Sequence, residues 1–527
     1  MTTFTLSLVS HTNVGKTTLA RTLLGRDIGE VRDAPHVTEF ADEFLLIESD
    51  GGQHRLMLWD TPGFGDSVRL ARRMKQSAHP LGWLLGVVWD RWRDRAFWMS
   101  QQALRHVKGG SDVLLYLVNA AEPEAGYLQS EMQLLAWTGK PVLVLLNQLG
   151  VPRSAAEEEV ELEQWRERLA PWAPVRAVLP LDAFARCWVH EAVLLQAVRE
   201  ALAVAAAGPA ELAGSAAERI AAFDTLRSAW AARHEARFVQ ACGELADSLA
   251  RTATAREVVQ EPAGLSGRLR DWGARLVNPA ANDDPVAAAQ QRLAAALEAE
   301  VRASTQRLLQ LHGLAAGRAS ESARSGPDDT VARILGRVAA QMQPHRRVPE
   351  GRSAVLGGAL TGALAGLKAD LVTGGLTLGG GLLAGGIIGA LGAAGLARGI
   401  NIVRGTGRSW VAWSAAALPA LTEAALLRYL AVAHYGRGRG EWSDAEAPPH
   451  WPAVVAAAMA PRREAFERLW NSRNERRPEP DEAARLAQAL APFIDASLSE
   501  TLAALHPHAH TAGVRQGSPM RPLQPLG

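Results

Sequence analysis

The 527-residue sequence contains only two cysteines, Cys187 and Cys242, which lie far apart and lack the spacing of metal ligands. So few cysteines exclude a disulfide-stabilised scaffold and a zinc finger, and they are typical of the reducing cytosol. Charge of one sign is not in excess either, because 56 lysines and arginines are matched by 55 aspartates and glutamates. No global field therefore favours nucleic acid, and we expect none as a partner. The N-terminus lacks a basic n-region, so no secretory signal is expected.

The segment SHTNVGKTTL, residues 10–19, lies between an apolar run and a helix-like segment. A strand, a tight loop ending in Gly-Lys-Thr and a helix point backbone N–H groups and a helix N-terminus at a phosphate chain. The first position of the usual GxxxxGK pattern is Ser10, a small residue that still fits. Lys16 is expected to reach the terminal phosphates. The predicted nucleotide-binding residues of this segment are Ser10, Asn13, Val14, Gly15, Lys16, Thr17 and Thr18.

Two later segments continue this pattern in chain order. The polar segment 25–39 contains Thr38, which is expected to close on magnesium and the terminal phosphate. A predicted strand then ends in Asp60-Thr61-Pro62-Gly63. Asp60 can hold magnesium through water, and the Gly63 N–H can sense the terminal phosphate. We therefore expect a metal set of Thr17, Thr38 and Asp60, and a catalytic set of Lys16, Thr38 and Gly63.

Through the pieces TNVGKTT and DTPGFGD, the chain resembles the translation-factor-related GTPases of the Era and TrmE kind. The resemblance implies an α/β Ras-like G domain that hydrolyses GTP with Mg²⁺ and a K⁺ ion held by Asn13. A cation, a protein partner or a second G domain in a homodimer could complete the site. Phe64 follows the glycine, and no glutamine stands ready to orient water, so unassisted hydrolysis is expected to be slow. The whole chain is also similar to a bacterial GTPase family whose C-terminal part is a domain of unknown function.

The base-recognition motif departs from that family's pattern. The apolar strand 141–147 is followed by Gln148-Leu149-Gly150, where the family would have Lys-x-Asp after Asn147. Asn147 and Gln148 are expected to bind the base, but Gly150 lacks the carboxylate that accepts two hydrogen bonds from guanine. We therefore expect a weakened preference for guanine. Asp182, after the next predicted strand, could replace that carboxylate or could equally cap a helix.

The sequence divides into five predicted regions. The α/β P-loop domain, residues 1–205, has a mostly parallel sheet and a Trp- and Arg-rich insertion at 66–110. This insertion could lie at a membrane interface, dock on the chain or simply pack as an amphipathic helix. A large all-α region follows. Its predicted parts are a stalk or bundle at 206–350, a Gly-rich hydrophobic hairpin at 351–405, further helices at 406–510 and a disordered tail at 511–527. His506, His508 and His510 alternate near the end and could bind a metal adventitiously, but they are expected to be solvated tail residues.

The Gly-rich segment 353–397 carries almost no charge. Its glycines recur at four-residue spacing, as at Gly381, Gly385 and Gly389, which lets helices approach closely in lipid. Arginines flank both ends, so both ends are expected on the cytoplasmic face of the inner membrane. The alternative is a glycine-zipper hairpin buried inside a soluble helical domain.

These features predict a GTPase that couples its nucleotide state to a membrane-associated helical domain, with dynamin-like remodelling as its sharper version. A soluble switch that recruits a protein partner through the helical region is the main alternative. An RNA or ribosome assembly GTPase is a weaker one, because it would need a basic appended domain.

Overall fold

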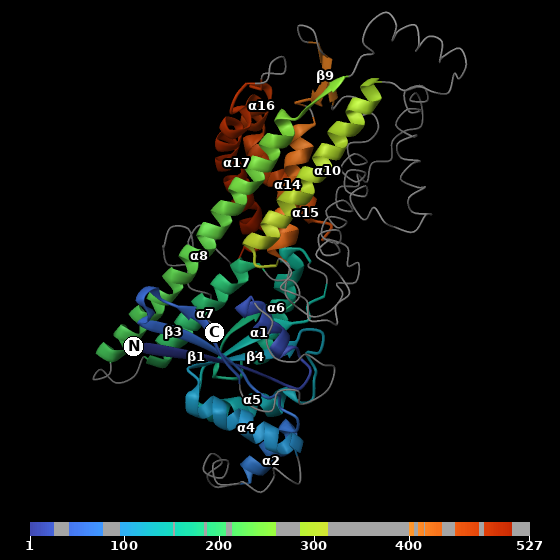
Figure 1. The fold of residues 1–527 in the computed structure, drawn as a ribbon. Helices are drawn as coiled ribbons and strands as arrows, with labels where there is room; N and C mark the ends of the chain where they lie inside the picture. Colours follow the sequence, from blue (N-terminus) through green and yellow to red (C-terminus); the bar gives the residue numbers. More distant parts are fainter. Residues whose placement is uncertain are drawn as a thin grey trace, which may run out of the picture. The chain divides into compact units, whose positions relative to one another are not determined.

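The computed structural model forms two compact units, which are described separately. The first consists of residues 1–236 with 433–445 and 502–527, and the second consists of residues 237–432 and 446–501. The structure describes residues 1–25, 42–76, 95–150, 153–183, 187–206, 213–259, 285–314, 400–404, 409–415, 417–434, 448–473 and 479–507 (Figure 1).

A six-stranded sheet organises the first unit, in the order β2-β3-β1-β4-β5-β6. All neighbouring strands are parallel except the antiparallel pair β2 and β3. The predicted α/β fold class is confirmed. In such sheets ligands bind at the carboxyl ends of the strands. The strands are β1 (Thr2–Ser10), β2 (Asp42–Glu48), β3 (His54–Asp60), β4 (Val113–Asn119), β5 (Val142–Asn147) and β6 (Val175–Pro180).

The central strands β4 and β5 are buried along nearly their whole length, as expected of a parallel sheet covered on both faces. One face packs in a single apolar cluster against α2, α4, α5 and α6. Alternate side chains, such as Leu115 and Leu143, are buried on the opposite face. The helices of this unit are α1 (Lys16–Leu24), α2 (Ser67–Lys75), α4 (Arg95–Gly110), α5 (Leu128–Thr138), α6 (Ala155–Leu169), α7 (Trp188–Ala206) and the first part of α8 (Ala213–Thr254), and a short 3-10 turn η1 covers Asp50–Gly52.

The second unit is largely helical, as predicted, but it also contains a three-stranded antiparallel sheet in the order β7-β9-β8. These strands, β7 (Arg256–Val259), β8 (Ile400–Arg404) and β9 (Ser409–Trp413), were not expected. They are four or five residues long, and β7 pairs with β9 from a distant part of the sequence, so local patterning gives them little signal. The helices are the rest of α8, α10 (Pro285–Leu311), α14 (Leu418–Ala433), α15 (Trp451–Met459), η4 (Ala460–Arg462), α16 (Arg463–Asn471) and α17 (Glu482–Leu505).

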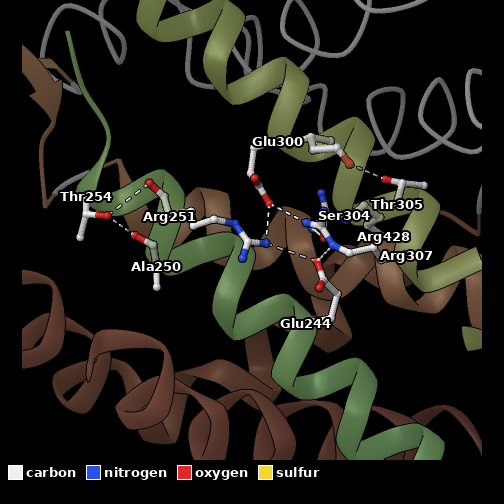
Figure 2. A network of polar contacts seen from close by, with 10 residues as sticks. Glu244, Ala250, Arg251, Thr254, Glu300, Ser304, Thr305, Arg307 and Arg428 are labelled. Atoms are coloured by element: carbon white, nitrogen blue, oxygen red, sulfur yellow. Dashed lines mark hydrogen bonds and ion pairs between the residues drawn. The ribbon is translucent and has the colours of Figure 1, made fainter. Parts of the chain in front are cut away.

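Charged side chains of α8, α10 and α14 form a network in the second unit (Figure 2). Glu300 accepts from Arg251 at 2.8 Å and from Arg307 at 2.9 Å, and Arg307 Nε lies 2.7 Å from Glu244 Oε1. Arg428 is only 4% exposed, and its Nη2 donates to Ser304 Oγ at 3.2 Å. Burial lowers the pKa of Arg428 to about 10, against the opposing effect of the Glu244 and Glu300 carboxylates.

Arg473 ties the end of α16 to two other elements of this unit. Its guanidinium donates to the carbonyls of Trp470, Ala253 and Trp413 at 2.7, 2.6 and 3.2 Å. A fork of several N–H donors can satisfy several backbone acceptors at once, which suits arginine to such a junction.

Several predicted features fall outside the described residues. They are the switch residue Thr38, the Gly-rich segment 353–397, the part of the insertion from 77 to 94, and His508 and His510 of the tail. Among the helices that the structure does describe, none combines the length and apolar character needed to cross a bilayer.

Candidate nucleotide-binding site

The loop between β1 and α1 is wound tightly at the carboxyl end of the sheet. Asn13 and Gly15 adopt positive φ angles of 65° and 96°. A Cβ added to Gly15 would lie 2.8 Å from Nδ2 of Asn147, so both the backbone angle and the available space require glycine. Helix α1 begins at Lys16, and the Gly15 carbonyl accepts its first hydrogen bond from Leu19 N–H at 2.9 Å.

Lys16 folds back over this loop. Its Nζ donates to Ser10 Oγ at 3.1 Å. Burial of the ammonium lowers the pKa of Lys16, and the carboxylates of Asp60 and Glu131 oppose that shift. Gly63 lies directly beside it, because a Cβ at Gly63 would be 3.0 Å from Lys16 Nζ. The lysine and the DTPG glycine predicted from sequence are therefore neighbours in space.

Thr17 and Asp60 form a pair suited to a hard cation. Thr17 Oγ1 donates to Asp60 Oδ2 at 2.6 Å. Asp60 is 1% exposed, and no donor among the described residues reaches its other oxygen, Oδ1. Burial raises the pKa of Asp60, and the Lys16 charge and the Thr17 hydrogen bond oppose the shift. A hydroxyl and an uncompensated buried carboxylate fit Mg²⁺, which prefers oxygen ligands.

The DTPG segment is bonded to the P-loop strand. Thr61 Oγ1 donates to the Leu8 carbonyl at 2.6 Å, and Phe64 N–H donates to the Ser10 carbonyl at 2.9 Å. Beyond it, Ser100 Oγ of α4 accepts from the N–H groups of Gly65 and Asp66 at 3.0 and 3.1 Å. The residues after Gly63 are thus connected to α4, which lies within the predicted Trp- and Arg-rich insertion at 66–110.

Asn147 connects two loops. Its Nδ2 donates to the Val14 carbonyl at 2.7 Å, and its Oδ1 accepts from Ala183 N–H at 2.9 Å. Both ends of the amide are therefore engaged with backbone. Asp182 Oδ2 accepts from Leu149 N–H at 2.8 Å, so this carboxylate also braces the loop after β5. Gln148 is exposed with a φ angle of 58°.

Sequence reasoning missed a buried network beside the P-loop. His11 Nδ1 lies 2.7 Å from Oε1 of Glu131, which is fully buried in α5, and the Tyr116 hydroxyl donates to Oε2 at 2.8 Å. Burial and the Glu131 charge raise the pKa of Tyr116 well above its usual value. The His11 ring also stacks on Tyr127 with centroids 4.1 Å apart. The available sequence signal was one glutamate on the apolar face of a helix.

The predicted site residues thus lie on neighbouring loops, with two qualifications. Thr18 is buried within α1, and Thr38 lies outside the described residues. The positions that the described loops bring to the carboxyl end of the sheet are Ser10, Asn13, Val14, Gly15, Lys16, Thr17, Asp60, Gly63, Asn147 and Gln148.

Residues 5–148 match the family model described as 50S ribosome-binding GTPase. Residues 210–492, more than half of the chain, match the model described as Domain of unknown function (DUF3482). The chain belongs to the DUF3482 family. Its N-terminal part is a P-loop GTPase domain, and the predicted combination of such a domain with a C-terminal domain of unknown function is confirmed in this DUF3482 protein.

Three solved structures are similar to the DUF3482 protein at low identity. A variant of Aquifex aeolicus Era bound to GDP.AlF4- shows 17% identity and a TM-score of 0.26, with 34% of this chain and 52% of that chain covered. Era in complex with MgGDPNP and a segment of 16S ribosomal RNA shows 20% identity and a TM-score of 0.25. The match covers 34% of this chain and 51% of that chain. An oligomerised bacterial dynamin pair shows 10% identity and a TM-score of 0.19. The match covers 98% of this chain and 70% of that chain. The chain spans about half the length of the Era structures, and none of the three indicates what this protein binds.

Proposed function

We propose that this protein binds GTP with Mg²⁺ and hydrolyses it to GDP and phosphate. The observation that carries the proposal is the convergence of Lys16, the Thr17–Asp60 pair and Gly63 on the loop before α1. These groups offer a cation for the phosphates, oxygen atoms for a metal ion and a backbone N–H for the terminal phosphate. The GTPase match of residues 5–148 supports the same chemistry.

Each group has a distinct role in this proposal. Backbone N–H groups of the loop and the N-terminus of α1 bind the phosphates, and Lys16 stabilises the charge that builds on them. Mg²⁺, when bound, neutralises charge on the phosphate oxygens. Asn147 positions the P-loop against the loop after β6. The proposed nucleotide and metal residues are Ser10, Asn13, Val14, Gly15, Lys16, Thr17, Thr18, Thr38, Asp60, Gly63, Asn147 and Gln148.

Substitution of the lysine tests the reaction. We expect Lys16→Ala to lower kcat for GTP by about 100- to 1,000-fold, the typical effect of losing one transition-state donor. Its melting temperature should stay close to that of the wild type. Lys140→Ala is the matched control, because Lys140 precedes β5 at the opposite end of the strands. Wild-type turnover in a folded Lys16→Ala protein would remove the P-loop from the mechanism.

The base and the monovalent cation require separate measurements. Gly150 supplies no carboxylate and the Asp182 carboxylate accepts from Leu149 N–H, so we propose a weakened preference for guanine. Asn13 is exposed in the loop, in keeping with a K⁺ site there. Competition binding with GTP, ATP and XTP measures the base preference. The hydrolysis rate in KCl, compared with that in NaCl, measures the dependence on K⁺. Equal rates in the two salts would contradict the K⁺ site.

The proposal includes a membrane-associated helical region whose contact with lipid depends on the bound nucleotide. Its support is the nearly uncharged sequence of residues 353–397 with arginines on both sides. Liposome flotation in the apo, GTP-analogue and GDP states tests it, with Gly381, Gly385 and Gly389 changed together to Leu as a packing control. Identical partitioning in all three states would leave the segment as a constitutive anchor. Failure to bind liposomes would favour the soluble, partner-recruiting switch.

A further inference from the structure

Three side chains from distant parts of the sequence meet within the first compact unit. Cys187 immediately precedes α7, His434 immediately follows α14, and His506 immediately follows α17. One ligand atom of each lies within 4.8 Å of the other two. The Nε2 atoms of His434 and His506 are only 2.9 Å apart. A thiol and two imidazoles therefore converge on one point, and none of them belongs to the proposed nucleotide site.

The backbone holds these three groups in place. Cys187 is fully buried, His434 is 7% exposed, and His506 is half-buried. The Cys187 carbonyl accepts from His190 N–H at 3.0 Å, so Cys187 occupies the N-cap position of α7. A helix N-terminus favours a thiolate over a thiol. His506 N–H donates to the Leu502 carbonyl at 2.9 Å, which continues the pattern of α17.

His190 positions the cysteine further. Its Nδ1 accepts from the Cys187 N–H at 3.1 Å, and its ring packs edge-on against the His506 ring with centroids 4.4 Å apart. These two contacts fix the backbone of Cys187 and the ring of His506. Partners of this kind outside the ligand set commonly tune and orient a metal centre.

We propose that Cys187, His434 and His506 bind a Zn²⁺ ion. One thiolate and two imidazoles are donors that Zn²⁺ accepts, and zinc bonds of about 2.0–2.3 Å place tetrahedral ligand atoms about 3.3–3.6 Å apart. The two Nε2 atoms would need to separate by a few tenths of an ångström. A fourth position remains for water.

Binding changes the protonation of the three ligands. In the metal-free protein, one imidazole donates its Nε2 proton to the Nε2 of the other. Both Nε2 lone pairs must face the metal, so the donor imidazole moves its proton to Nδ1 and loses none overall. The cysteine thiol releases its proton to solvent as the sulfur–zinc bond forms.

The sequence offered only a weak indication of metal binding, in the alternating histidines His506, His508 and His510. The two cysteines lack ligand spacing, and His506 was expected to be a solvated tail residue. The structure corrects the second expectation, because His506 is hydrogen-bonded to His434 at the end of a helix.

Metal titration of the full-length, metal-stripped protein tests the proposal. We expect about one equivalent of Zn²⁺ to bind in competition with a chromogenic chelator and to raise the melting temperature. Co²⁺ in place of Zn²⁺ should give a thiolate-to-metal charge-transfer band. Cys187→Ser should abolish that band, whereas the matched control Cys242→Ser, at the other buried cysteine, should retain it.

Two further variants keep the test decisive. His506→Gln changes the most exposed ligand and should weaken Zn²⁺ binding by about 100-fold. The double variant His508→Gln/His510→Gln removes the neighbouring tail histidines and should bind as tightly as the wild type. Binding that survives both Cys187→Ser and His506→Gln, or that is lost in the tail variant, would overturn the site. So would a wild-type protein that binds no Zn²⁺, which would leave the two histidines as an ordinary hydrogen-bonded pair.

Discussion

Two groups of carboxylates, one at the nucleotide site of the first unit and one in the second unit, differ in how their charge is met. In the first, Asp60 and Lys16 lie at the carboxyl end of the sheet, and no described donor reaches Oδ1 of Asp60. In the second, the carboxylates of Glu244 and Glu300 are already bridged by Arg251 and Arg307 (Figure 2). A buried carboxylate with one oxygen that no described donor reaches indicates a ligand site, whereas carboxylates neutralised by arginines indicate a structural role.

The largest effect should come from the second unit. Arg428→Ala removes a large buried side chain and its hydrogen bond to Ser304, and such large-to-small changes typically cost about 2–5 kcal/mol because they leave a cavity. We expect the free energy of unfolding, measured in urea, to fall by that amount. Arg428→Met fills a similar volume without the charge and should cost less. A change below about 1 kcal/mol in Arg428→Ala would mean that the network does not hold this unit together.

Next in size is a change at the nucleotide site. Gly63→Ala would place a methyl group 3.0 Å from Lys16 Nζ and 3.1 Å from Thr12 Cα, so the loop or the lysine must move. The required shift is a few tenths of an ångström, less than the 1 Å misplacement that can cost about 100-fold, so we expect kcat to fall by about 10-fold. Gly126→Ala is the matched control, because a Cβ there has no neighbour within 4 Å. Unaltered GTP turnover in Gly63→Ala would separate this glycine from the chemistry.

Asp60→Asn should produce a smaller effect, which depends on pH. The pKa of Asp60 is raised from 3.8 in the folded protein, so the folded protein binds its proton more tightly than the unfolded chain does. Its ionisation therefore lowers stability as the pH rises through the raised value. Without nucleotide, Asp60→Asn should become more stable than the wild type as pH increases above 4, and Mg²⁺ should no longer strengthen its nucleotide binding. A stability difference that does not vary with pH would contradict the uncompensated charge.

The smallest effect should come from Arg251, a partly exposed member of the charged network. Arg251 is 43% exposed in its side chain, although it pairs with Glu300 at 2.8 Å. Partly exposed ion pairs contribute about 0–1 kcal/mol. Arg251→Met should therefore change the free energy of unfolding far less than Arg428→Ala does. Equal losses for the two arginines would show that burial does not distinguish them.

Sequence reasoning succeeded where the chemistry lies in consecutive residues. The loop at Lys16 and the DTPG segment at Asp60 could be predicted because strand ends and glycines have local signatures. Contacts between distant residues could not, and these include the His11–Glu131 pair and the Cys187 cluster. The bracing role of Asn147 was also missed, because its two bonds depend on how three loops pack.

Strand β7 has a consequence for synthesis on the ribosome. The six strands of the first sheet have all been synthesised once Pro180 is made, whereas β7 ends at Val259 and its partner β9 begins only at Ser409. At about 5–20 residues per second, this separation corresponds to a delay of roughly 8–30 s. During that time β9, the described strand that pairs with β7, has not yet been made. The β7 segment therefore waits for β9, and a strand segment without its partner is the kind of surface that chaperones protect from aggregation.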